Sequence, residues 1–362
     1  MQSIKKILSH RFYFAPVWVF ASMNLLTGTW ILYIPYIKNN FGLNDSEVGI
    51  ALFFIAIGLL ISFPLVPLLN KIAGIGKSTK WGIFIYSLAY NLPFLASTYF
   101  SLCFCLAIIG MFAGITSISM NALVSTIENK NSFKFMSAAH GFYSLGGFIG
   151  AGSGSLIMVF LTKPNYHMAT ISMFVCLSNL YLAKQYCNII EEKKETNRFN
   201  YNFKTIKSLL GLAFVAFIIL LNEGAVENWS NLFIYDTFKT PQNIAGLGFI
   251  AFSLSMTLGR FLGDDISKKF GPIRVMYFGC LIAVIGYLFS FSNNLIITIT
   301  GFGITGFGLS VIIPEVFRLS GNTDGIETST GISTVSGIGF LGFLVGPLIL
   351  GYISNLRNLF WS

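Results

Sequence analysis

The sequence predicts an all-α integral membrane protein that crosses the bilayer about eleven times. Hydrophobic residues make up 54% of its 362 residues and charged residues 10%, whereas about 25% of a typical soluble domain is charged. The hydrophobic residues form continuous runs of about 20 residues, the length that spans a bilayer as a helix. Lysine and arginine collect in alternate loops between these runs, which is the pattern of a multi-span topology.

Each apolar run is expected to be a helix, because lipid cannot satisfy open backbone donors and acceptors. The first run follows a short basic segment but is too long for a signal peptide, so we interpret it as the first span. Six runs precede the longest polar segment of the chain and five follow it. The predicted spans are residues 14–36, 48–69, 81–97, 102–127, 136–160, 166–186, 208–235, 244–263, 272–290, 294–320 and 330–352.

The polar segment at residues 187–207 divides the chain into two predicted helical halves, residues 1–186 and 208–362. Its mixed charges are typical of a solvated linker rather than a ligand site. The halves also resemble each other locally. A basic turn after the second span has a glycine three residues after Lys71, and a basic turn after the eighth span has one three residues after Lys268. This similarity favours an internal repeat of helical units.

The distribution of basic residues predicts a cytoplasmic N-terminus. With that orientation nineteen of the 23 lysine and arginine residues fall in inner segments, and the outer segments hold only Lys38, Lys163, Lys239 and Arg357. Cytoplasmic loops typically carry such an excess. The net charge of +9 therefore indicates membrane orientation and not nucleic-acid binding, for which a basic face or an aromatic stacking platform would be needed.

Several classes of chemistry lack their motifs in this sequence. No phosphate-binding Walker loop, Ser-His-Asp order or HExxH zinc motif occurs, so we expect neither ATP hydrolysis nor an enzyme. The five cysteines lack the spacing of a zinc site or of a disulfide framework. The sequence therefore predicts no catalytic residue, metal or cofactor, and any active transport would draw on an ion gradient.

Two glutamates lie in the predicted seventh span. Glu223 and Glu227 are four residues apart, so they share one face of a helix. A carboxylate in lipid costs at least about 2.5 kcal/mol, so such residues usually face a cavity or a partner. Solute binding or ion coupling is one interpretation, and a structural group, or for Glu227 an interface position, is the other. Trp229 follows them and would be either an interface anchor or a sugar-stacking surface.

Further polar residues are candidates for a binding site. His140 lies early in the fifth span, with Asn121 of the fourth span at similar depth as a candidate partner. A histidine titrates near neutral pH and would relay protons; the alternative is a buried neutral imidazole. For Asn121 and for Asn24 of the first span, the alternative to solute binding is adhesion between helices. Glu315 and Arg318, near the inner end of the tenth span, are spaced to form an ion pair at an inner gate.

Several segments resemble the major facilitator superfamily of transporters. The segment GRFLGDDISKKFGPIR, residues 259–274, is similar to the signature loop of that superfamily. The ordered segments SMNALVSTIE, AAHGFYSLGGFIGAG, EGAVENWSNLFI and GISTVSGIGFLGFLVGPLILGYI extend the resemblance over nearly the whole chain. Together they look like a bacterial branch related to fucose-permease-type sugar transporters. The resemblance implies a fold of two six-helix halves in a bacterial inner membrane, with Arg260, Asp264 and Lys268 in the gating loop.

The signature loops depart from the family pattern. Lys71 and Lys268 stand where these loops usually carry an aspartate. In the second half Asp264 and Asp265 are expected to compensate, by packing against Arg260 or against the start of a neighbouring helix.

Two further departures concern coupling and length. Ile31 and Ser117 stand where sugar-permease relatives carry acidic residues tied to proton coupling, so sugar–proton symport by that route is not expected. The sequence also stops soon after the eleventh span, and the twelfth helix of the superfamily fold is therefore expected to be missing.

The leading hypothesis is a secondary carrier, expected to be a monomer, that moves a small polar solute by alternating access. A sugar is one candidate solute, and a proton or sodium ion is the expected coupling ion. Glu223, His140, Asn121 and Asn24 would line a cavity between two rocking halves. The alternative hypothesis, favoured by the missing helix and the replaced aspartates, is a non-transporting membrane protein such as a sensor or a truncated carrier.

Overall fold

A computed structural model describes residues 2–157, 163–191, 203–240, 244 and 247–356 of the chain. In this part of the chain the regular secondary structure is helical, and no strand is described. Seven helical stretches of these residues are long and apolar enough to cross a membrane, judged by length and composition. The predicted all-α membrane fold is therefore confirmed.

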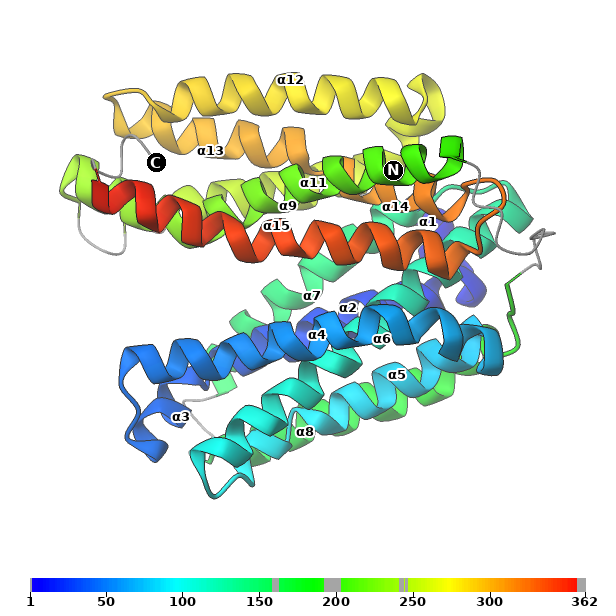
Figure 1. Cartoon of the computed structure of the whole chain (residues 1–362), viewed down its shortest axis with the longest axis horizontal. Coiled ribbons are helices and arrows are strands. Elements are labelled where there is room, and N and C mark those ends of the chain that lie inside the picture. The colour runs from blue at the N-terminus through cyan, green and yellow to red at the C-terminus, as the bar shows by residue number, and fades with distance from the viewer. Residues whose placement is uncertain (1, 158–162, 192–202, 241–243, 245–246, 357–362) are drawn as a thin grey trace.

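The helices before residue 192 lie together and form one hydrophobic core, centred on side chains such as Phe20, Leu26 and Leu106. Most of them lie in the lower part of Figure 1, coloured from blue through cyan to green. We call them the N-terminal set: α1 (Gln2–Ser9), α2 (Arg11–Ile31), α3 (Ile34–Phe41), α4 (Asp45–Ala73), α5 (Ile75–Ala89), η1 (Leu92–Phe94), α6 (Tyr99–Asn131), α7 (Met136–Ile157), α8 (Pro164–Leu182) and η2 (Ala183–Gln185).

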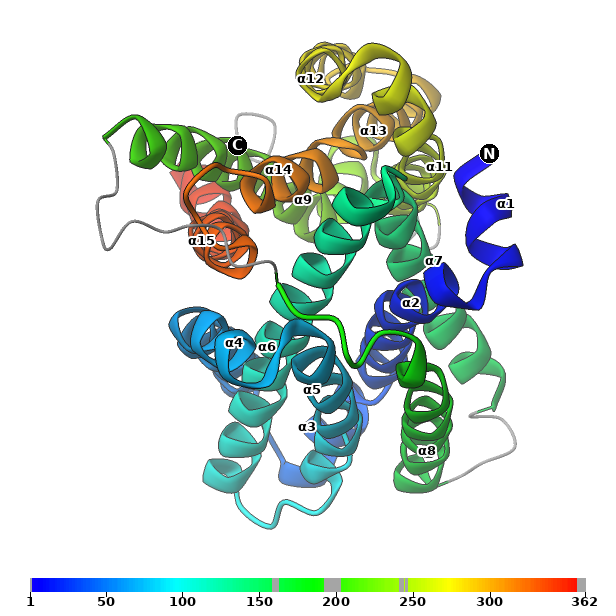
Figure 2. The same ribbon diagram turned by 90° about the vertical axis from the view of Figure 1, so that its right-hand side faces the viewer.

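The helices after residue 202 form a second core around Phe252, Ile312 and Val316. Figure 2 looks along the helices and shows the two sets meeting where α7 approaches α11 and α15 approaches α4. The C-terminal set contains α9 (Phe203–Phe238), α11 (Leu247–Phe270), α12 (Pro272–Ser290), α13 (Leu295–Leu309), α14 (Ile312–Gly321) and α15 (Thr328–Leu356). Most of the predicted linker 187–207 lies outside the described residues, so its boundaries stay a prediction.

Among the described residues, two predicted spans are each divided between two α-helices, and a third, 81–97, is α-helical only to Ala89, where α5 ends. The span predicted at 14–36 is divided between α2 and α3, and the one at 294–320 is divided between α13 and α14. Pro35 and Pro314 lie in the first turns of α3 and α14. A proline lacks the N–H that would bond the carbonyl four residues earlier and clashes with that carbonyl. Those carbonyls belong to Ile31, the last residue of α2, and to Ser310, the residue directly after α13.

The predicted basic turns are much shorter than expected. The predicted second and eighth spans end at residues 69 and 263, which was wrong, because α4 continues to Ala73 and α11 to Phe270. Only Gly74 (φ +86°) and Gly271 (φ +84°) turn the chain. A positive φ is favourable only for glycine, which has no Cβ. Both glycines occupy the predicted position three residues after a lysine, so the local similarity extends to backbone conformation.

Close helix pairs repeat in the two sets. A Cβ atom on Gly146 of α7 would lie 2.0 Å from the Ala21 carbonyl oxygen of α2, and one on Gly342 of α15 would lie 2.1 Å from the Phe217 carbonyl oxygen of α9. The two pairs are related by the same shift along the sequence. Small residues allow such close approach between membrane helices, and here they fix α7 to α2 and α15 to α9.

Candidate functional site

Hydrogen bonds that join the two sets concentrate at one end of the bundle. This end carries α1, where Ser3 Oγ donates to Asp265 Oδ1 (3.1 Å), and the last turns of α6 and α11. At the same end Asn129 of α6 contacts Asn322, which follows α14. We call it the N-terminal end. The sets are held together there by polar contacts, which is the arrangement of a closed gate.

A buried group of charges lies at this end, the gate cluster Glu128, Asp264, Glu315 and Arg318. Arg318 donates to Glu128 through Nε (2.6 Å) and through a terminal nitrogen (3.1 Å). It also donates to Asp264 (2.6 Å) and to Glu315. The predicted pair of Glu315 with Arg318 is therefore present, within a larger group. Three carboxylates surround one guanidinium, and the four residues are at most 5% exposed.

The gate cluster also caps the start of α7. Glu128 Oε1 accepts from the backbone N–H groups of Phe135 (2.5 Å) and Met136 (2.7 Å). Asp264, from the other set, accepts from those of Ser137 (3.0 Å) and Ala138 (2.6 Å). The first N–H groups of a helix lack partners inside it and carry partial positive charge. Asp264 therefore packs against a helix start, one of the two predicted alternatives, and it does not pair with Arg260.

Arg260 lies one turn before Asp264, inside α11 rather than in the predicted loop. Its guanidinium donates to Glu223 Oε1 of α9 (3.1 Å) and to Ser144 Oγ of α7 (2.6 Å). The side chains of Arg260 and Glu223 are only 9% and 13% exposed. A buried ion pair thus connects α9 to α11 in one set and reaches α7 in the other.

Glu227 lies one turn after Glu223 on α9, as predicted. Its side chain is exposed, and its carboxylate interacts electrostatically with Glu223 and Arg260. The Tyr143 hydroxyl of α7 is within electrostatic range of the same three groups. Two carboxylates thus lie near one guanidinium.

His140 and Asn121 form the predicted hydrogen bond, from Nε2 to Oδ1 at 3.1 Å. The Asn121 amide nitrogen donates to the Ser117 carbonyl (2.8 Å), so its oxygen is the acceptor and Nε2 carries the proton. His140 is buried and contacts the rings of Phe20 and Phe317. The pair therefore joins α6 to α7 beside the gate cluster.

The remaining candidates lie elsewhere or outside the described side chains. Asn24 Nδ2 donates to the Tyr143 carbonyl (3.1 Å), which ties α2 to α7. Lys268 is exposed in the last turn of α11. Trp229 lies in α9, but its side chain is outside the described part of the structure.

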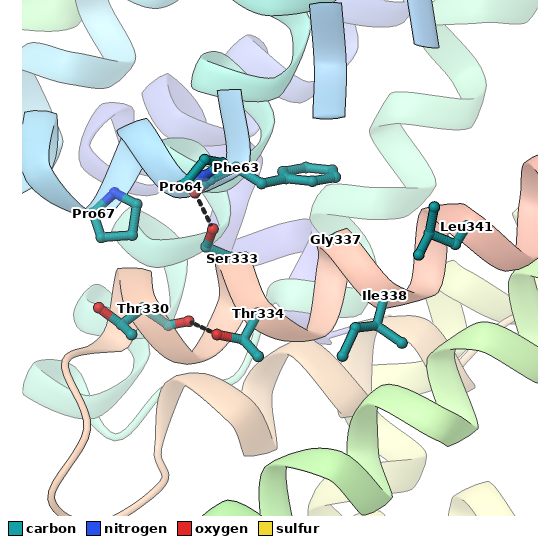
Figure 3. A pocket seen from close by; sticks show the side chains of 9 residues that line it. All are labelled: Phe63, Pro64, Pro67, Thr330, Ser333, Thr334, Gly337, Ile338 and Leu341. Carbon is teal, nitrogen blue, oxygen red and sulfur yellow. Dashed lines mark hydrogen bonds between the residues drawn. The ribbon is translucent and has the colours of Figure 1, made fainter. Parts of the chain in front are cut away.

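A second contact between the sets lies between α4 and α15 (Figure 3). Ser333 Oγ donates to the Phe63 carbonyl oxygen (2.5 Å). That carbonyl lacks its usual helical partner, because the residue four positions later is Pro67, which has no N–H. Beside this bond lies a groove of about 460 Å³, lined by Phe63, Pro64, Pro67, Thr330, Ser333, Thr334, Gly337, Ile338 and Leu341.

Sequence reasoning missed Glu128, Tyr143 and Ser144. Glu128 ends the quoted segment SMNALVSTIE, and an acidic residue at the end of an apolar run is itself a signal. Ser144 and Tyr143 carry no such signal, because serine and tyrosine are common in membrane helices. Their proximity to Arg260 and Glu223 depends on how α7 packs against α11.

Two bundles of apolar helices, a gate at one end and buried charges between them define a membrane transport protein. A family model, the Major Facilitator Superfamily, matches residues 17–203 and 212–362. The chain therefore belongs to the Major Facilitator Superfamily of transporters. This membership favours transport over the alternative of a non-transporting membrane protein.

Relatives and solved structures agree with this membership. An uncharacterized MFS-type transporter of Yersinia pestis is 29% identical over 340 residues, covering 91% of this chain and 85% of that protein. The membrane protein MosC of Rhizobium meliloti is 24% identical, covering 92% and 82%. The transporter FucP in its outward conformation has a TM-score of 0.80 at 16% identity, covering 97% and 94%. The human organic anion transporter MFSD10 has a TM-score of 0.73 at 14% identity, covering 96% and 94%.

Proposed function

We propose that the chain is a proton-coupled carrier of a small polar solute, with its binding site around Glu223, Glu227 and Arg260. The observation that carries the proposal is the ion pair of Glu223 with Arg260, which lies inside the helices and also reaches Ser144 of the other set. Charges at membrane depth are costly and usually mark a solute or ion pathway. Asn121 and His140 are proposed to border this site.

The charge balance favours a proton as the coupling ion. Arg260 balances one of the two glutamates, and the second leaves one negative charge that a proton neutralises. Two close carboxylates interact unfavourably when both are ionised. Transfer of this proton from Glu227 to Glu223 would weaken the ion pair of Glu223 with Arg260, and solute hydroxyl groups would then fill the vacated hydrogen-bond positions. Sodium is the alternative ion, and the experiment below distinguishes it from a proton.

The site and the gate are connected through α11. Arg260 lies one turn before Asp264, and its carbonyl oxygen accepts from Ser137 Oγ of α7 (2.6 Å). A shift of Arg260 after protonation would therefore act directly on the bonds that close the N-terminal end. This connection supports alternating access, with the described state closed at that end.

A sugar is the first solute to test, because one structural neighbour is the E. coli fucose:proton symporter FucP. We propose that the carboxylates of α9 take the coupling role, since the positions expected from sugar-permease relatives hold Ile31 and Ser117. We further propose a monomer in a bacterial inner membrane with a cytoplasmic N-terminus. The basic residues Lys71, Lys268 and Lys269 at the N-terminal end support that orientation.

The test is uptake into proteoliposomes with an imposed pH gradient or an imposed sodium gradient. The panel would contain fucose, other monosaccharides, polyols and amino acids. We expect uptake driven by the pH gradient alone, and we expect Glu227→Gln to abolish accumulation while leaving solute exchange. Glu47→Gln is the matched control, because Glu47 caps the exposed start of α4. Accumulation by Glu227→Gln equal to that of the parent, or uptake driven only by sodium, would refute the proposal.

A further inference from the structure

The two interfaces between the sets are built on equivalent hydrogen bonds. At the α7–α11 interface Ser137 Oγ donates to the Arg260 carbonyl oxygen (2.6 Å). At the α4–α15 interface Ser333 Oγ donates to the Phe63 carbonyl oxygen (2.5 Å). Arg260 and Phe63 each lie eleven residues before the turning glycine of their helix, Gly271 or Gly74. The internal repeat therefore includes the contacts that hold the two sets together.

The two interfaces differ in their carboxylates. One turn after Arg260 lies Asp264, which caps the start of α7 from the other set. One turn after Phe63 lies Pro67, which has no carboxylate. The two interface serines also lie at different distances from the start of their helices. Ser137 is the second residue of α7, whereas Ser333 is the sixth residue of α15. The free N–H groups of α15 are therefore about one turn farther from α4.

Glu191 accepts a hydrogen bond from one of these displaced N–H groups. Its Oε1 accepts from the backbone N–H of Ser329 at 3.1 Å. Ser329 is the second residue of α15, as Ser137 is of α7, and it is fully buried. Both helices thus have a carboxylate on the N–H of their second residue.

The segment that carries Glu191 is attached to the N-terminal set. The Gly76 N–H donates to the Ile189 carbonyl oxygen (3.0 Å). The Ile190 side chain lies against the turn at Gly74, where an added Cβ would approach it to 3.0 Å. Because these contacts fix the segment to the α4–α5 turn, the bond from Ser329 to Glu191 connects the two sets and breaks when they separate.

We propose that Glu191 is a positioning residue that closes the α4–α15 interface, in the role that Asp264 has at the α7–α11 interface. A carboxylate at a helix N-terminus is stabilising because it satisfies a free N–H and faces the positive end of the helix dipole. Glu191 provides this stabilisation only in the closed state. Its loss shifts the ratio of closed to open gate toward open by roughly five-fold, the factor for a typical N-cap of about 1 kcal/mol.

The test measures gate closure directly and needs no known solute. Spin labels at Lys71, in the last turn of α4, and at Asp324, before α15, report the α4–α15 interface, since both residues are exposed. Distances would be measured in lipid nanodiscs, with the native cysteines replaced by alanine. Glu191→Ala is expected to lower the ratio of short to long distances about five-fold, because alanine has no acceptor for the Ser329 N–H. Glu47→Ala removes the carboxylate that accepts from the Asn44 N–H at the other end of α4, and it is expected to leave the ratio unchanged.

A double-mutant cycle assigns the effect to the bond itself. Ser329→Pro removes the N–H that Glu191 accepts, at a helix position where proline is tolerated. Adding Glu191→Ala to this variant is expected to produce no further shift. A distance distribution of Glu191→Ala that matches that of Glu47→Ala would overturn the proposal, and so would a full five-fold shift on the Ser329→Pro background.

Discussion

Replacing Arg318 by methionine is expected to open the gate. Arg318 makes four hydrogen bonds to three carboxylates, but only those to Glu128 cross between the two sets. Asp264 and Glu315 remain on the same side as Arg318 when the sets separate, so their contributions largely cancel between closed and open states. The net loss is thus that of one buried ion pair, about 3 kcal/mol at the lower end of measured values. This corresponds to an open fraction about 150-fold larger.

The open fraction is measurable as the alkylation rate of a buried cysteine. Ala138 is fully buried at the start of α7, and Ala138→Cys in a background without native cysteines places a thiol behind the gate. While the closed state dominates, the rate is proportional to the open fraction, so Arg318→Met is expected to accelerate alkylation about 150-fold. Arg318→Lys is expected to have a smaller effect, because it keeps the positive charge. An effect should remain, because an ammonium group cannot reproduce the paired contacts with Glu128.

The matched control is Arg274→Met, which removes an exposed arginine at the start of α12. It is expected to leave the alkylation rate unchanged. An Arg318→Met rate within about threefold of that of Arg274→Met would show that the buried cluster does not hold the sets together.

The same alkylation assay applies to the serines at the two interfaces. Ser137→Ala and Ser333→Ala should each raise the alkylation rate roughly five-fold, because each removes one hydrogen bond of about 1 kcal/mol. The double variant should combine both factors. Gly342→Ala should lower the thermal unfolding temperature, because its Cβ would lie 2.1 Å from a carbonyl oxygen, an overpacking of about 1–3 kcal/mol. Gly152→Ala, with nothing within 4 Å, is its control, and equal temperatures would contradict the packing argument. Asn121→Leu should destabilise the fold by about 1–3 kcal/mol in chemical unfolding, because it leaves a buried imidazole N–H unpaired; an unchanged midpoint would show that water replaces Asn121.

The sequence was informative about helices because lipid imposes strict length and hydropathy requirements. Where span predictions failed, the physical reason is local. Pro35 and Pro314 divide two spans into separate helices, whereas Pro64 and Pro67 lie within α4 without ending it. Whether a membrane helix continues past a proline depends on what satisfies the freed carbonyl, and for Pro67 that is Ser333 of another helix.

Contacts of the candidate site could be predicted only where the depth of two residues in the membrane was sufficient to pair them. Asn121 and His140 were paired from similar depth in adjacent spans, and the structure contains that bond. Arg260 was assigned to a gating loop because residues 259–274 resemble the signature loop of the superfamily. The helix α11 continues to Phe270, and Arg260 lies inside it beside Glu223. The partners of Arg318 on α6 and α11 could not be predicted either, since they depend on how the two sets pack together.

Arg260 takes part in two contacts through different atoms. Its carbonyl oxygen accepts from Ser137, whereas its guanidinium binds Glu223 and Ser144. Substitution of the side chain leaves the carbonyl in place, so Arg260→Met would remove the bonds to Glu223 and Ser144 and preserve the bond from Ser137. One of the two bonds between Arg260 and α7 is therefore independent of the residue type at position 260, and the two sets stay joined there through the backbone.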